Sequence, residues 1–222
     1  MKAWIAALLA LVFCLSMTAC GDTGIMSLGE EKEEEHEVLI PVAVLDLTEE
    51  DEILLNGELK DGVYTNRYFG VRFTAPEGWS LSRLNDDAAE TTEIFPLRKA
   101  YEEEMGGIVF MASPETFGQF ILLSIRALKE DEIGLNEEEV VKANIDAVWE
   151  INRALGEERG PELGKATFIG EEHPMSIQRQ ETENGLSLYV SFYLPRGDFV
   201  YDVYITTPDG TLEELTALFE KI

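Results

Sequence analysis

Strand-like alternation of apolar and polar positions dominates the chain from residue 62 onward. The runs that predict strands are 63–64, 71–74, 108–112, 120–128, 165–169, 174–181, 186–194 and 199–206. The run 120–128 is apolar at nearly every position, which predicts a strand covered on both faces. Asn184-Gly185 separates two alternating runs and predicts a two-residue hairpin turn. The C-terminal half therefore reads as an antiparallel meander.

Helix signals interrupt these strand groups. Asn136 with Glu139, and Thr211 with Glu214, have the spacing of helix-capping boxes. The expected apolar faces are Val141, Ile145, Val148 and Ile151 or Leu155 in the first helix, and Leu212, Leu215, Leu218 and Phe219 in the second. Residues 86–105 are polar and compatible with one broken helix or two short ones. Strands joined by hairpins, with helices between strand groups, predict an α+β fold in which helices flank an antiparallel sheet as an α/β/α sandwich.

The segment before residue 59 has a different composition. Residues 20–61 hold 14 acidic and 2 basic side chains, and residues 30–37 are an almost continuous acidic run. Such a run repels itself and favours an extended tether. Residues 38–47 are rich in Val, Leu and Ile and predict a docked edge strand, and Thr48 begins a helix-start pattern. We therefore expect a tether over 20–58, with a partly docked apolar segment, and a domain over 59–222.

The N-terminus predicts export and lipid attachment. Lys2 precedes an apolar run over residues 3–15, whose 13 positions span only about 20 Å as a helix, short of a bilayer core. This is the pattern of a signal peptide, here residues 1–19. Thr18-Ala19-Cys20 resembles the lipobox of bacterial lipoprotein precursors, in which the cysteine is acylated after cleavage just before it. An ordinary secretory signal with Cys20 as a free thiol is the alternative.

Charge and cysteine content narrow the function classes. The net charge is −27, which disfavours nucleic acid and anionic lipid as partners. Cys14 lies within the expected signal peptide, so Cys20 is the only cysteine of the expected mature chain and no disulfide can form. A domain without disulfides must be stabilised by its own core.

The run over residues 64–79 leads from a strand pair into a Pro76-Glu77-Gly78-Trp79 turn, and it resembles the opening of PsbP-like domains. The closing half is similar as well, with a long helix, a meander and a C-terminal helix, so the resemblance covers about residues 60–222. It implies an α+β fold and, because relatives with this fold mostly bind proteins, a non-enzymatic role. No residue set for manganese or calcium matches, so the resemblance implies no cofactor and no functional residue is carried over.

Few residues suggest chemistry of their own. Glu171-Glu172-His173 contains possible metal ligands, but a solvated turn before Pro174 is the favoured interpretation. Trp79 is expected to anchor one end of the core. Tyr189 and Tyr193 share a strand face, with Tyr201 and Tyr204 on the next strand. These rings form either a recognition surface or, as favoured, part of the core.

The sequence thus predicts a lipoprotein held by Cys20 at the extracytoplasmic face of the cell membrane, whose domain binds an envelope protein and is not an enzyme. The candidate interaction residues are Tyr189, Tyr193 and Tyr204. The alternative is a receptor for a small ligand, such as a cationic solute attracted by the acidic surface.

Overall fold

The computed structural model describes residues 40–82, 97, 108–114, 118–156, 159–182 and 185–222. The predicted signal peptide, Cys20, the acidic run and most of the helical segment predicted at 86–105 lie outside this part of the chain. No helix among the described residues is long and apolar enough to cross a membrane.

The larger of two antiparallel sheets has seven strands. In spatial order they are β4 (Trp79–Ser82), β5 (Ile108–Pro114), β6 (Phe120–Ala127), β10 (Phe199–Pro208), β9 (Gly185–Arg196), β8 (Glu171–Thr182) and β7 (Glu162–Phe168). Every neighbouring pair is antiparallel. Thr182 pairs with Gly185, so β8 and β9 are joined by the predicted two-residue hairpin. The strands predicted at 108–112, 120–128 and in the C-terminal meander are confirmed.

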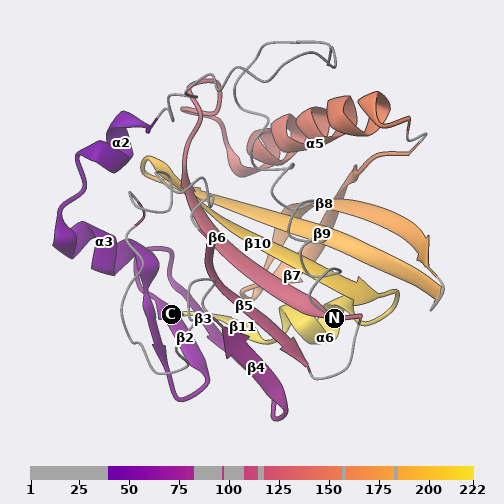
Figure 1. Ribbon diagram of the computed structural model, residues 1–222, viewed down its shortest axis with the longest axis horizontal. Helices are drawn as coiled ribbons and strands as arrows, with labels where there is room; N and C mark the ends of the chain where they lie inside the picture. The colour runs from indigo at the N-terminus through magenta and orange to yellow at the C-terminus, as the bar shows by residue number, and fades with distance from the viewer. Residues whose placement is uncertain (1–39, 83–96, 98–107, 115–117, 157–158, 183–184) are drawn as a thin grey trace, which may run out of the picture.

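The second sheet has four strands and covers one face of the first. Its order is β1 (Glu58–Lys60), β2 (Val63–Asn66), β3 (Val71–Thr74) and β11 (Phe219–Lys221). Aromatic rings fill the space between the sheets: Tyr64 and Phe73 contact Phe110, and Phe219 contacts Phe168. Figure 1 shows this small sheet below and to the left of the long strands. The predicted α+β class is confirmed. The layer that covers the core face of the large sheet is mostly the small sheet.

Helix α5 (Glu137–Ala154) lies on the other face of the large sheet, above β8 and β9 (Figure 1). The predicted capping box is confirmed: the Asn136 side chain accepts from the Glu139 N–H, and Glu139 accepts from the Asn136 N–H. Val141 and Ile145 are buried as expected, whereas Leu155 at the C-cap is 71% exposed. The helix therefore buries its first half most fully.

An N-terminal arm of two short helices, α2 (Val42–Leu45) and α3 (Glu49–Asn56), packs beside the small sheet. The expected edge strand at 38–47 is wrong over 42–45, because Pro41 starts a helical turn whose N–H groups bond back to the Pro41 carbonyl. The helix predicted from Thr48 is confirmed, with a capping box between Thr48 and Asp51. Asn66 donates to the Leu55 carbonyl oxygen at 2.6 Å and ties the arm to β2.

The chain end differs from the sequence expectation. Helix α6 spans only Leu212–Thr216, and the Thr211 side chain does not cap it, because its hydroxyl donates to the Pro208 carbonyl oxygen. Phe219 is not on a helix face but in β11, opposite Phe73. Pairing with β3 and burial of the Phe219 ring replace a further helical turn.

Residues 171–173 and Trp79 are the other two places where the sequence predicted local structure. Glu171-Glu172-His173 does not form a turn: these residues begin β8, and Ile169 and Gly170, both with positive φ, make the turn before them. That geometry suits a two-residue hairpin. Trp79 opens the edge strand β4 and packs against the core while remaining partly exposed.

Candidate functional site

The outer face of the large sheet, which α5 covers only in part, holds the candidate site. Side chains alternate between faces along a strand, so the register identifies the residues on this face. Tyr193 pairs with Asp202, Tyr189 with Thr206, and Tyr204 with Ser191. The three predicted tyrosines therefore share the outer face. Tyr201 points to the core, where its ring stacks on Phe69 at 5.1 Å.

The three tyrosines differ in how far they are covered. Tyr193 is buried with Val140, Val141, Ile145 and Val200 beneath α5. Tyr189 and Tyr204 lie farther from that contact and remain partly exposed, as does Phe120 on β6. The Phe120 and Tyr204 rings are 5.6 Å apart. We call Phe120, Tyr189 and Tyr204 the tyrosine surface.

Burial governs the chemistry of these phenols. It raises the pKa of Tyr189 and that of Tyr204 above the ordinary 10.0, with nearby Asp202 adding to the shift at Tyr204. Both hydroxyls are therefore neutral at physiological pH and serve as hydrogen-bond groups. A ring that is apolar on its body and polar at its tip suits a protein interface.

A charged cluster, made of Arg126, Glu132, Asn144 and Asp202, lies between the tyrosine surface and α5. Arg126 donates to Glu132 through both terminal guanidinium nitrogens, with Nη2 at 2.8 Å from Oε1, and the Glu132 side chain is only 1% exposed. Asn144 on α5 donates to the same carboxylate at 3.0 Å. Burial alone would raise the pKa of Glu132, but hydrogen bonds from Arg126 and the Lys129 N–H hold it below its usual value. Glu132 is thus a paired, ionised carboxylate that joins the sheet to α5.

Asp202 is less well satisfied. It lies on the outer face of β10 opposite Tyr193 and Ser124, and its Oδ1 is inaccessible to solvent with no hydrogen-bond partner among the described residues. Burial raises its pKa from 3.8 to about 7, and the Glu132 charge adds to the rise while Arg126 opposes it. Perturbed groups of this kind occur both at functional sites and in structural networks.

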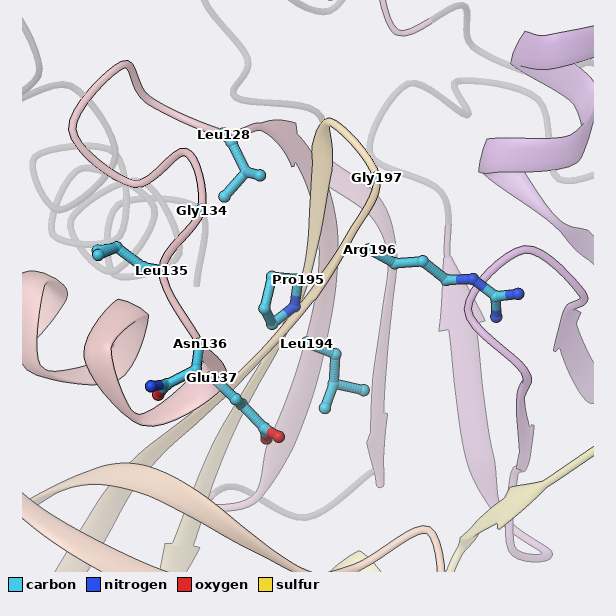
Figure 2. A pocket seen from close by; sticks show the side chains of 9 residues that line it. All are labelled: Leu128, Gly134, Leu135, Asn136, Glu137, Leu194, Pro195, Arg196 and Gly197. Atoms are coloured by element: carbon cyan, nitrogen blue, oxygen red, sulfur yellow. The ribbon is translucent and has the colours of Figure 1, made fainter.

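A hollow of about 460 Å³ lies at the N-terminus of α5 (Figure 2). Leu128, Leu135 and Leu194 contribute apolar walls. The Glu137 side chain extends from the start of α5 toward Leu194. Arg196 extends away from the other lining side chains, and its guanidinium lies 5.5 Å from the centre of the Tyr68 ring. The hollow is therefore lined by apolar and polar groups together, with the Glu137 carboxylate and the Arg196 backbone among them.

Glu137 also holds the one buried histidine of the described chain. His173 Nδ1 lies 2.7 Å from Glu137 Oε1, and its Nε2 is buried without a partner among the described residues. The expected solvated turn at 171–173 is thus replaced by a strand whose histidine contacts α5. No group of three or more His, Cys, Asp or Glu side chains able to hold a metal occurs in the described part of the chain.

The sequence singled out the tyrosines but missed the charged cluster. Arg126 and Asp202 each interrupt a strongly apolar strand, and that interruption is the available signal. Cys20, the predicted lipid attachment site, lies outside the described residues.

Comparison with known proteins finds similar folds only at low similarity. No protein-family model matches the sequence, and no curated protein matches it significantly. A cyanobacterial PsbP from Synechocystis sp. PCC 6803 matches with a TM-score of 0.43 and 12% identity, over 72% of this chain and 91% of that one. A Bacteroides thetaiotaomicron VPI-5482 protein matches at 0.36 and 11% identity, covering 75% of this chain and 49% of that one. LpqN, described as involved in cell envelope biogenesis of Mycobacterium tuberculosis, matches at 0.36 and 12%, covering 67% and 76%. PsbP, the family that the sequence resembles, is thus among these structures.

Proposed function

We propose that this chain is a lipoprotein anchored through Cys20 at the extracytoplasmic face of the cell membrane, and that its domain binds an envelope protein without catalysing a reaction. The observation that carries the binding role is the tyrosine surface. Helix α5 leaves Phe120, Tyr189 and Tyr204 partly exposed on an otherwise well-packed sheet. Tyrosines and other aromatics are enriched at the centres of protein interfaces.

The rigidity of the surface supports this role. Phe120, Tyr189 and Tyr204 stand on three adjacent strands, β6, β9 and β10, that are paired along most of their length. A partner therefore meets rings that are already ordered, which lowers the entropy lost on binding. The tether supports access to partners: the 21 residues from Cys20 to Ile40 can span at most about 70 Å.

Site-specific photo-crosslinking in intact cells tests the binding role. A photoreactive residue at position 189 should form an adduct with one envelope protein, and the same residue at exposed Glu150 on α5 should not. Phe120→Ser should then weaken binding of the captured protein by about tenfold or more. Adducts of equal yield at both positions would contradict a specific surface.

Cell fractionation tests the anchor separately. Cys20→Ala removes the thiol to which lipid would attach, so the variant should accumulate as uncleaved precursor or appear in the released fraction. The domain should keep its fold, because Cys20 precedes the packed arm. Normal maturation and unchanged retention of the variant on the membrane would overturn the lipoprotein assignment.

The hollow at the N-terminus of α5 supports a second candidate, binding of a small cationic ligand. Its volume lies within the range of small-molecule sites, and Glu137 supplies a negative charge at its edge. A ligand present at about 100 times its dissociation constant would add about 2.7 kcal/mol of stability. A thermal-shift screen of organic cations, repeated on Glu137→Gln, tests this: a cation that stabilises only the parent chain supports the site, and none doing so rejects it.

A further inference from the structure

The N-terminal arm buries two polar side chains and leaves several apolar side chains exposed. On α3 the polar residues Glu52 and Asn56 point inward, whereas Ile53 and Leu54 are 51% and 45% exposed. Glu52 accepts a hydrogen bond from the N–H of buried Leu97, and the Asn56 amide donates to the Glu52 carbonyl oxygen. The inward face thus combines these hydrogen-bonded polar groups with Leu55, which is 2% exposed, and Ile53 and Leu54 are left outside.

Helix α2 also exposes apolar side chains. Val42 and Leu45, three residues apart on one side of the helix, are 71% and 43% exposed, while Val44 between them is completely buried. Figure 1 shows α2 and α3 in succession along one flank of the molecule, away from the long strands. We call Val42, Leu45, Ile53 and Leu54 the arm patch. A single exposed Leu or Val is common on protein surfaces, but grouped apolar side chains with a polar rim mark binding sites.

Acidic side chains flank the arm patch along the chain. Asp46, Glu49, Glu50 and Asp51 are all exposed and lie between its two apolar pairs in the sequence. Residues 40–57 contain five acidic side chains and no basic one. Hydrogen bonds from Thr48 lower the pKa of Asp51, so this carboxylate remains ionised even in mildly acidic conditions. The arm therefore offers apolar contacts beside acidic side chains, with no basic side chain over residues 40–57.

We infer that the arm patch is a docking site for a protein that presents apolar side chains ringed by Lys and Arg. The charge argues against the other occupants. A second copy of this chain would bring two uniformly acidic arms together, and juxtaposed like charges oppose association. The negative surface of a membrane that contains anionic lipids would repel the arm in the same way. A basic partner instead gains electrostatic attraction together with burial of apolar area.

Photo-crosslinking on the full chain in intact cells tests this inference. A photoreactive residue at Ile53 should give an adduct with a protein whose crosslinked segment contains Lys or Arg beside apolar residues. Ile133, which is 68% exposed in the loop before α5, is the matched control position. An adduct with lipid, an adduct with a second copy of the chain, or no adduct beyond that at Ile133 would overturn the proposal.

Affinity measurements with the captured protein then separate the apolar and charged contributions. Ile53→Ser with Leu54→Ser should weaken binding by about tenfold or more. The control pair Ile133→Ser with Leu155→Ser removes similar exposed apolar area and should change binding less than about twofold.

Raising the salt concentration from about 50 to about 300 mM should weaken the parent complex about threefold, and Glu49→Gln with Glu50→Gln should reduce that dependence. If the α3 variant melts well below the parent, Val42→Ser with Leu45→Ser makes the same test on α2. Equal losses in the patch and control variants, or binding insensitive to salt, would overturn the inference.

This docking site is independent of the tyrosine surface. An adduct at position 53 without one at position 189 would support the arm patch and reject the proposed role of the tyrosine surface. The reverse result would reject the arm patch alone.

Discussion

The two faces of the seven-stranded sheet are built from the same strands but differ in what holds them. On the core face, Phe192, Val203 and Ile205 are completely buried against apolar neighbours. On the outer face, the next residues along the same strands include Tyr193 and Asp202, and a charged cluster sits beneath α5. The core face is stabilised by shape and apolar area, whereas the outer face combines an apolar contact with α5 and paired polar groups. Stability is therefore concentrated on one face, and the proposed binding surface lies on the other.

The largest effect is expected on the core face. Phe192 stacks on Phe168 with ring centroids 4.5 Å apart and is completely buried. Phe192→Ala should reduce the free energy of unfolding by about 4 kcal/mol, because it removes apolar contacts and leaves a cavity. Denaturant unfolding measures this, with Phe192→Leu as the milder control. A loss below about 1 kcal/mol would contradict the claim that apolar packing on the core face supplies most of the stability.

Breaking the charged cluster is expected to cost somewhat less. Arg126→Met leaves the Glu132 carboxylate buried without its main partner, a change that costs about 3 kcal/mol in comparable sites. The double variant Arg126→Met with Glu132→Leu removes both charges, and it should recover much of that loss. If the double variant were as unstable as the single one, shape rather than charge pairing would govern this part of the outer face too.

The sequence predicted the strands and α5 better than the contacts between them, for a physical reason. Alternation and capping patterns are local, and they correctly located β8, β9 and α5. Arg126 and Asn144 both bind Glu132, and this arrangement depends on how α5 crosses the sheet, which no local pattern encodes. The same limit explains Phe219, whose helical spacing was overridden by pairing with β3. The tyrosines were found because period-2 alternation assigns a face, but coverage by α5 decided which of them are buried.

Asp202 allows a smaller, pH-dependent test. Its pKa is raised from 3.8 to about 7 in the folded chain, so the folded state binds more protons than the unfolded state between these values. Stability should therefore fall as the pH rises from about 4 to about 7 and change little above that. Asp202→Asn should remove this component and stabilise the protein at pH 8 by about 1–2 kcal/mol. Thermal unfolding across the pH range measures it, and a variant with the same pH slope as the parent would contradict the assignment.

The smallest effect on stability is expected at Tyr189 on the outer face. Its ring is partly exposed on the outer face, so truncation removes only part of the apolar area that a buried ring would lose. Tyr189→Ala should lower the free energy of unfolding by less than about 1 kcal/mol, as is usual for substitutions outside the core. Leu188 is its neighbour on β9 but points to the core and is 4% exposed, so Leu188→Ala is the matched control and should cost about 2–4 kcal/mol. Two adjacent residues of one strand would then differ severalfold in their effect on folding, and only the first should alter binding of a crosslinked partner. Equal destabilisation by the two variants would place Tyr189 in the core and leave Phe120 and Tyr204 as the exposed part of the surface.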